Sequence, residues 1–388
     1  MNIDFIENAD FLSMCYAQDV MDCTLLCEYP SSNSDQTPLR NSEDFIIHDP
    51  FPPPNPSLLK TLGPHHLMFG WGNAVPVASQ IAPPDDLVRH WEAILGLGAK
   101  PDWREFKIDD RDSNYLVLFP HESVEAKQQA IDPYVNYQLH SKKVIECIDC
   151  PQPNVLKEIE FPCIAKLSHG YAGLGNYMIR SPEDDYAMRT ELNSRWKGAE
   201  LVITKIVDSI VGDYGVQYYL TKGGHVKWIG YTEQNFDANQ RWCGGRYDAQ
   251  QQYSMAQVFK PFIEASSRYL HENSYFGVVG IDVLKDQHEN FFLVDLNPRL
   301  TGITPFVMGA KKLEREHGFT KGLYSASCTF SGEPTELFDF VEQIEESRVA
   351  VLSYYEDRDE CVTLCHLGFY SNSDEANVKA LRRIKLKR

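Results

Sequence analysis

Two carboxylates and an amide in the last third of the chain have the types and spacing of a magnesium site. Asp282 lies in an apolar run that predicts a strand over 278–284, and Asp295 and Asn297 end a second predicted strand over 291–296. Residues two apart on a strand share a face, and antiparallel pairing can bring all three side chains to one side. Carboxylate and amide oxygens suit Mg²⁺, which also binds substrate phosphates. The alternative is a strand that ends in a polar turn, but carboxylates in an apolar hairpin cost free energy unless they are neutralised.

A lysine and a glycine-rich segment upstream predict a second anion-binding feature. Lys166 ends a predicted strand over 161–167, and Gly170, Gly173 and Gly175 follow before another predicted strand. Glycines let backbone N–H groups approach an anion closely, and the lysine adds a point charge. The segment is neither a Walker A loop nor a dinucleotide-binding fingerprint, because a strand follows it rather than a helix. A tight hairpin with a surface lysine is the alternative interpretation.

Hydrophobic periodicity predicts the elements that position these residues. The expected helices cover 85–95, 123–140, 182–196, 256–272 and 374–387. The other expected strands cover 115–119, 177–180, 201–207, 216–220, 226–231, 349–355 and 362–370. The polar stretch 231–252 is expected to be a long loop, and long loops inside compact domains are often functional. This mixture of helices and strands predicts an α/β chain.

Composition and charge exclude several classes of protein. With 43% hydrophobic and 24% charged residues, the 388-residue chain is typical of two or three globular domains. Its net charge of −18 gives no general attraction to nucleic acids or anionic membranes. No apolar run approaches the roughly 18 residues of a membrane helix, and the N-terminus lacks a secretory signal pattern. We therefore expect no nucleic-acid or membrane partner, a cytoplasmic location and reduced cysteines. Two close cysteine pairs lie too far apart for a zinc site, so buried thiols are expected: Cys147 with Cys150, and Cys361 with Cys365.

The order of these features resembles the ATP-grasp superfamily over about residues 135–310. The similarity is greatest to its carboxylate–amine and carboxylate–thiol ligases, including D-alanine–D-alanine ligase, and to biotin carboxylase. The resemblance implies an α/β (α+β ATP-grasp) fold in four parts. These are an N-terminal pre-ATP-grasp domain (1–135), a small lobe with the glycine-rich loop (136–205), a large lobe with the metal site (206–325) and a C-terminal cap (326–388).

The resemblance also implies nucleotide-binding roles. Lys142 and Lys166 would reach the ATP phosphates, and Lys143 competes with Lys142 for its role. The backbone of the hinge at 201–207 would contact adenine, although Thr204 stands where the family usually has Glu. The remaining implied nucleotide contacts are Ser168, Gly170, Gly173, Gly175, Thr204, Lys205, Val207 and Asp213.

Metal and substrate roles follow from the same resemblance. The implied ligands of one or two Mg²⁺ ions, or of Mn²⁺ in their place, are Asp282, Asp295 and Asn297. Asp295 stands where the family usually has Glu. Lys166 and Arg299 are catalytic candidates, and Arg299 would hold the γ-phosphate or the substrate carboxylate. Arg246 is either a further catalytic residue that clamps a carboxylate or acylphosphate, or a surface arginine. Asp213 either binds the ribose hydroxyls or is an ordinary turn aspartate.

The implied function is an ATP- and Mg²⁺-dependent ligase. It would activate an amino-acid-like carboxylate as an acylphosphate and couple it to an amine, releasing ADP and phosphate. The partners are then two small molecules, and a homodimer is compatible with the family. One alternative is an ATP-grasp enzyme with another acceptor, a carboxylase or a hydroxyl kinase, although no biotinyl Met-Lys-Met occurs here. The other is a non-catalytic nucleotide-binding regulator, which the intact set of acids, Asn297 and Arg299 disfavours.

Overall fold

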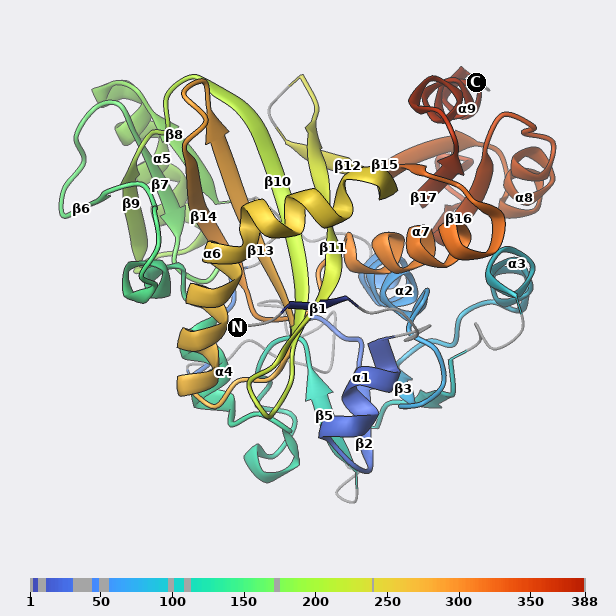
Figure 1. The fold of residues 1–388 in the computed structure, drawn as a ribbon, viewed down its shortest axis with the longest axis horizontal. Coiled ribbons are helices and arrows are strands. Elements are labelled where there is room, and N and C mark those ends of the chain that lie inside the picture. Colours follow the sequence, from blue (N-terminus) through green and yellow to red (C-terminus); the bar gives the residue numbers. More distant parts are fainter. Residues whose placement is uncertain are drawn as a thin grey trace.

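The computed structural model describes residues 3–5, 12–30, 44–48, 56–96, 101–107, 113–170, 175–238 and 241–386. Their helices are α1 (Leu12–Asp19), α2 (Pro56–Met68), α3 (Asp85–Leu95), η1 (Ala126–Gln128), α4 (Pro133–Leu139), η2 (Lys142–Cys147), α5 (Pro182–Arg195), η3 (Ala249–Gln251), α6 (Gln252–Glu272), α7 (Thr304–His317), α8 (Pro334–Glu342) and α9 (Asp374–Leu386). Their strands are β1 (Ile3–Phe5), β2 (Cys23–Leu26), β3 (Val77–Ser79), β4 (Trp103–Glu105), β5 (Asn114–Val117), β6 (Val155–Leu156), β7 (Cys163–Leu167), β8 (Asn176–Ile179), β9 (Leu201–Lys205), β10 (Ile210–Leu220), β11 (Val226–Phe236), β12 (Trp242–Asp248), β13 (Gly277–Asp286), β14 (Phe291–Asn297), β15 (Lys321–Ser331), β16 (Arg348–Asp357) and β17 (Val362–Ser371). These strands form three sheets (Figure 1).

The N-terminal part is built on a small parallel sheet. Its order is β4-β3-β2-β5, and every neighbouring pair is parallel. The central strands β2 and β3 are buried along their whole length, as parallel strands covered on both faces usually are. Helix α3 has the predicted bounds and ends at Gly96, whose φ of +84° favours glycine. The predicted α/β character of this part is confirmed.

The small lobe is an antiparallel sheet of order β6-β9-β7-β8 with α5 packed on it. Cys163, Ala165 and Ile179 form its buried core together with Met188 of α5. The turn from β7 to β8 closes at Gly175, which has a φ of +81°. A Cβ atom there would lie 2.4 Å from Leu167 Cδ1, so this position requires glycine.

The remaining strands form one large sheet. Its order is β14-β13-β10-β11-β12-β15-β17-β16, and β1 pairs with β11 from outside this path. Helix α6 lies across one face, where Phe259 and Ile263 pack on residues of β10, β11 and β13 (Figure 1). Helix α7 and the N-terminal part cover the opposite face through a second core. The sheet is continuous from β10 to β16, so it extends across residue 325.

Two predicted segments are wrong. The helix expected over 123–140 is η1 followed by α4, because Asp132 and Pro133 begin a new helix. The Asp132 carboxylate accepts the backbone N–H groups of Tyr134 and Val135, which caps α4 at its start. The loop expected over 231–252 consists mainly of strands β11 and β12 and the short η3.

The first and last parts of the chain pack on one another. Trp91 of α3 donates through Nε1 to the carbonyl of Val351 on β16, at 3.0 Å. His90 Nε2 accepts the Val351 N–H at 2.9 Å, and the Tyr354 hydroxyl donates to Asp86. Because residues of α3 and β16 belong to the same buried cluster, these segments share one core.

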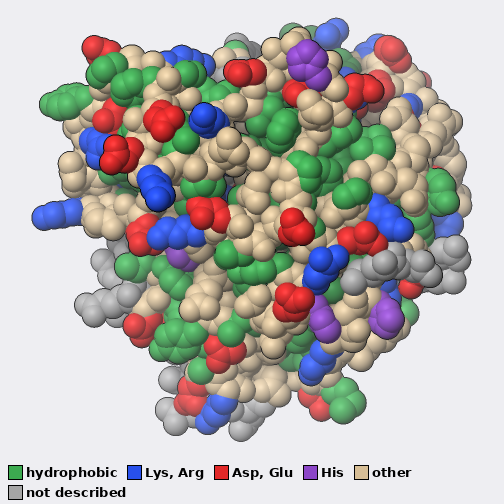
Figure 2. Space-filling view, turned by 60° about the vertical axis from the view of Figure 1, so that its left-hand side comes forward, with side chains coloured by type: hydrophobic (Ala, Val, Ile, Leu, Met, Phe, Trp, Pro, Cys, Tyr) green, Lys and Arg blue, Asp and Glu red, His purple; other side chains and the backbone are tan. Residues whose placement is uncertain are grey.

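Acidic and basic side chains are interspersed on the face shown in Figure 2, so the negative charge is spread out there.

All ten cysteines are free thiols. Cys365 is buried as expected and Cys150 is partly buried, but Cys147 and Cys361 are exposed, contrary to prediction. Among the described residues, no helix combines the length and the apolar character that crossing a membrane requires.

Candidate active site

Asp282 and Asp295 lie directly opposite one another on β13 and β14. In the same register Asn297 lies opposite Gly280, so all three predicted ligands face the same side of the sheet. Ile281 and Val283 between them point to the other face and are fully buried in the core under α6. The apolar alternation of these strands therefore anchors the hairpin and leaves its polar positions facing the site.

Two lysines from outside the large sheet reach β14. Lys142, at the start of η2, places Nζ 2.7 Å from each carboxylate oxygen of Asp295. Lys166, on β7, donates to the backbone carbonyl of Val294 at 2.9 Å. Lys143 turns away and pairs with Glu200 at the surface. The structure therefore brings Lys142 and Lys166, but not Lys143, to the carboxylates.

Hydrogen bonds fix η2 against the end of β7. The Lys142 N–H donates to the carbonyl of Ser168 at 2.8 Å, and the Ser141 and Ser168 hydroxyls are 2.8 Å apart. Ser168 therefore contacts the lysine segment, and its contribution to nucleotide binding stays a prediction. Gly170 forms an isolated bridge with His48, whereas Gly173 lies outside the described residues.

Burial and charge perturb the ionisation of the acids. Burial, reinforced by the charge of Asp295, raises the pKa of Asp282 to about 7. Burial alone would raise the pKa of Asp295, but Lys142 and Lys166 together bring it below its usual value. Burial also raises the pKa of Asp213 on β10 to about 6, against the charge of Lys166. Three partly buried acids near two lysines make an environment that a divalent cation would stabilise.

The donor set fits Mg²⁺ brought in with a nucleotide. Within the described ranges, no three His, Cys, Asp or Glu side chains are arranged to hold a metal ion by themselves. Mg²⁺ is commonly bound by one or two protein carboxylates, with phosphates and water completing its coordination. Asp282, Asp295 and the amide oxygen of Asn297 are such a set, and the core beneath the two ligand strands holds them in place.

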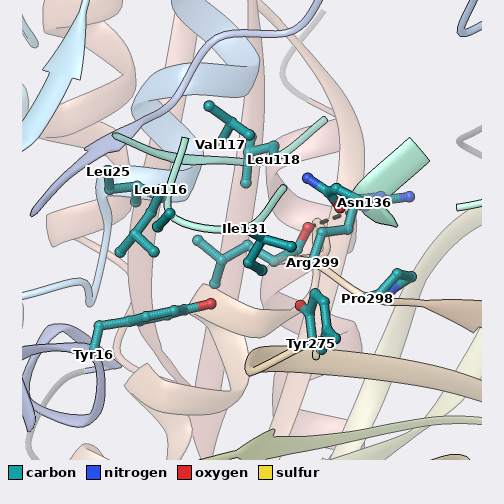
Figure 3. Close-up of a pocket in the computed structure, with 12 residues that line it drawn as sticks. Tyr16, Leu25, Leu116, Val117, Leu118, Ile131, Asn136, Tyr275, Pro298 and Arg299 are labelled. Atoms are coloured by element: carbon teal, nitrogen blue, oxygen red, sulfur yellow. Dashed lines mark hydrogen bonds between the residues drawn. The ribbon is translucent and has the colours of Figure 1, made fainter. Parts of the chain in front are cut away.

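Arg299 lies between the metal ligands and the N-terminal part. Its guanidinium donates to Asn297 Oδ1 at 3.1 Å and to the carbonyl of Leu300 at 3.0 Å, and it lies over the ring of Phe119. Arg299 and Asn136 line a mainly apolar cavity beside β5 (Figure 3). Arg299 also lines a second pocket with Lys142 and with residues His140, His169 and Asn297. An arginine in this place can contact both a phosphate and a substrate carboxylate.

Thr204 and Lys205 of the predicted hinge lie on β9, an inner strand of the small sheet. Thr204 is buried and pairs with β6 and β7, and the Lys205 N–H donates to the carbonyl of Asn154. Val207 is buried on the connection to β10. Asp213 pairs with Leu284 on β13, so it shares the face of Asp282. Its ribose contact stays a prediction, as do the adenine contacts of the hinge.

Arg246 is not brought to this site. It is exposed on β12 and lies opposite Glu233 on β11, whereas the neighbouring Gln234 lies opposite Gly245. Since successive strand residues alternate between faces, and Gln234 contacts Asp282, Arg246 points to the other side of the sheet. The surface-arginine alternative agrees with this position.

Residues 142–297 match the sequence model of a family described as L-aspartate–L-methionine ligase, ATP grasp. These residues have the ATP-grasp fold. The matched segment thus runs from Lys142, the lysine beside Asp295, to Asn297, the last predicted metal ligand. The resemblance inferred from the sequence is confirmed.

Solved structures share the ATP-grasp fold at low sequence identity. An N5-carboxyaminoimidazole ribonucleotide synthetase in complex with ADP matches with a TM-score of 0.55 and 14% identity, over 82% of this chain and 93% of that chain. The Staphylococcus aureus N5-carboxyaminoimidazole synthetase complexed with ADP matches with a TM-score of 0.52 and 12% identity, over 81% and 91%. The N5-carboxyaminoimidazole ribonucleotide synthetase from Thermus thermophilus gives 0.51 and 12%, over 81% and 93%. The predicted fold class is confirmed.

Sequence reasoning missed one polar contact of the ATP-grasp site. Gln234 on β11 donates to Asp282 Oδ1 at 2.8 Å. It lies in the stretch expected to be a loop, whose apolar-polar alternation after Tyr231 is too weak to predict a strand. His140 and His169, which line the pocket beside Lys142, gave no sequence signal either.

Proposed function

We propose that the protein is an ATP- and Mg²⁺-dependent ligase that joins an amino-acid carboxylate to the amine of a second amino acid. The observation that carries the proposal is the facing pair Asp282 and Asp295, approached by Lys142 and Lys166 within a segment that matches an amino-acid ligase family. The products would be ADP, phosphate and an amide. One or two Mg²⁺ ions, with Mn²⁺ as a substitute, and a homodimer are part of the proposal.

The first step must activate the substrate carboxylate, which is a poor electrophile. A carboxylate becomes reactive when the γ-phosphoryl group of ATP is transferred to it, which gives an acylphosphate and ADP. Catalysis of such a transfer is mainly positioning and charge neutralisation. Lys142 and Lys166 would bind the phosphates, and the nucleotide would replace Asp295 as the partner of Lys142. Mg²⁺ held by Asp282, Asp295 and Asn297 would supply the remaining positive charge.

The second step forms the amide. The substrate amine attacks the acylphosphate carbonyl and phosphate leaves, so a C–N bond forms as the C–O bond to phosphate breaks. Arg299 would stabilise negative charge on the carbonyl oxygen and on the departing phosphate. Water must be excluded at this stage, because it would hydrolyse the acylphosphate.

The test is nucleotide turnover with defined substrate pairs. The protein is incubated with Mg-ATP and amino acids, singly and in pairs, while ADP, AMP, phosphate and product mass are measured. We expect ADP and phosphate to form with one acid plus one amine, and the coupled mass to equal the sum of the two minus water. AMP as the product would contradict acylphosphate chemistry. ADP formation that needs bicarbonate or a hydroxyl compound instead would contradict the ligase.

Replacing one metal ligand sharpens this test. Asp295→Asn keeps the shape of the side chain but removes the charge that faces Asp282 and Lys142. We expect kcat/KM to fall by more than about 100-fold, while circular dichroism stays that of the wild type. Turnover at the wild-type rate in this variant would contradict the metal assignment.

A further inference from the structure

We propose that Gln234 is a positioning residue for the metal-binding carboxylate of Asp282. The inference rests on the proposed function, since it concerns the same metal site. Gln234 Nε2 donates to Asp282 Oδ1 at 2.8 Å, although the two residues lie on strands β11 and β13, which are separated by β10. In the described part of the chain, no other side chain donates a hydrogen bond to this carboxylate.

A glycine on the intervening strand makes this contact possible. Gly215 of β10 is the register partner of Asp282 on one side and of Thr232 on the other. A Cβ atom at Gly215 would lie 3.3 Å from Gln234 Nε2, so the amide would have to move by a few tenths of an ångström. Because glycine leaves this space open, the Gln234 side chain crosses β10 and reaches Asp282.

The amide of Gln234 carries no charge, and such a donor suits a carboxylate that must bind a metal ion. Asp295 is held by the ammonium group of Lys142, which neutralises its charge until a cation displaces it. Asp282 is held by a neutral amide, which fixes one carboxylate oxygen and brings no positive charge that would oppose a cation. Hydrogen bonds of this kind orient metal-binding carboxylates, and their loss typically costs about 10- to 100-fold in metal affinity. Gln234 thereby orients Asp282 toward Asp295.

The test measures Mn²⁺ binding directly, from the free-Mn²⁺ electron paramagnetic resonance signal with ADP present. Gln234→Met keeps the length of the side chain but removes the amide. We expect its Kd for Mn²⁺ to rise about 10- to 100-fold. In turnover assays the Mg²⁺ concentration for half-maximal rate should rise similarly, while kcat at saturating Mg²⁺ recovers most of its wild-type value. The matched control is Glu233→Gln, the exposed neighbour on the other face, which should bind Mn²⁺ like the wild type.

A second variant guards against misfolding of the first. Gly215→Ala leaves the amide in the chain but pushes a methyl group against it, so it should also weaken Mn²⁺ binding. Wild-type Mn²⁺ affinity in both Gln234→Met and Gly215→Ala would overturn the inference. If Asp282→Asn loses Mn²⁺ binding while these two retain it, the positioning role alone fails. If the wild-type protein with ADP binds no Mn²⁺, the metal site of the proposed function fails, and the inference fails with it.

Discussion

Lys142 and Lys143 are neighbours in the chain but have different partners. Lys142 forms a nearly buried ion pair with Asp295, with 10% and 18% of the two side chains exposed, whereas the pair of Lys143 with Glu200 is exposed. Lys142 thus holds the carboxylate that Mg²⁺ would bind. An ammonium group and a divalent cation on the same carboxylate repel one another, so binding of one weakens binding of the other.

This competition predicts opposite effects on metal and nucleotide. Lys142→Met should raise the affinity for Mn²⁺ measured without nucleotide, because the internal cation is gone. It should also raise the KM for ATP by about 10-fold or more, because a phosphate contact is lost. Lys143→Met is the matched control, and both quantities should stay within about twofold of the wild type. Equal effects of the two substitutions would contradict the assignment of Lys142.

Residue types and spacing predict part of the site and not the rest. The two-residue spacing of Asp295 and Asn297 already requires a shared face, and strand pairing then brings Asp282 opposite Asp295. The contact of Gln234 with Asp282 spans three strands, and no local pattern encodes it. Arg246 looked suitable by type alone, and only the register of β12 reveals which face it occupies.

At the scale of elements, the long buried segments were predictable because their periodicity is strong. Helices α3, α5 and α6 and strands β13 and β14 lie close to the predicted ranges. Strands β1 to β4 contain only three or four residues each, which is too short for a periodic signal. Strand β12 contains Gly244 and Gly245, residues that disfavour strands locally, and it is held by its partners β11 and β15. Tertiary pairing overrides local propensity there.

Gly244 provides a test of that pairing. Its φ is +141°, and a Cβ atom there would lie 1.9 Å from the carbonyl oxygen of Tyr324 on β15. We therefore expect Gly244→Ala to lower the free energy of unfolding by about 1–3 kcal/mol, measured by urea denaturation. Gly302→Ala, whose Cβ would meet only Trp242 at 3.8 Å, should change it by less than about 1 kcal/mol. Equal stability of the two variants would contradict this role of glycine in β12.

A buried carboxylate joins the ends of β2 and β3. Glu28 accepts hydrogen bonds from the Ser79 hydroxyl at 3.0 Å and from the Gln80 N–H at 2.6 Å. Burial raises the pKa of Glu28 to about 7, which exceeds its value in an unfolded chain. The folded state therefore binds the proton more tightly, and ionisation of Glu28 costs stability as the pH rises from about 4.5 to 7.

The comparison with a neutral side chain tests this pH dependence. Between pH 5 and pH 8, the free energy of unfolding of the wild type should fall relative to that of Glu28→Gln by about 2 kcal/mol. Denaturant titrations of both proteins at the two pH values measure this difference, and the effects of all other groups cancel. A difference that stays constant, or one that changes in the opposite direction, would contradict the raised pKa.

At the scale of the whole molecule, the N-terminal and C-terminal parts stabilise one another. Buried residues from Leu12 to Ile384 belong to one core cluster, and α3 contributes Trp91 to it. The division at residues 135 and 325 remains a prediction about domains. Because they share this core, loss of packing between α3 and β16 should lower the stability of both parts.

Trp91 tests this coupling. Trp91→Ala removes a fully buried indole and its hydrogen bond to Val351, which should cost about 3–5 kcal/mol. Unfolding followed by fluorescence and by Mg-ATP turnover should shift together to lower urea concentration. Tyr186→Ala, at an exposed position of α5, should stay within about 0.5 kcal/mol of the wild type. A loss of turnover well before unfolding would indicate separate units instead.

The central claim is that ATP activates a carboxylate as an acylphosphate, and oxygen transfer tests it most directly. The amino acid identified as the acyl substrate is labelled with ¹⁸O in its carboxylate and converted with Mg-ATP and the amine. Mass spectrometry of the released phosphate then follows the label. Our account predicts one ¹⁸O atom in the phosphate for each amide formed, because the bridging oxygen of the acylphosphate leaves with phosphorus. Phosphate without label, or label found in AMP, would contradict it.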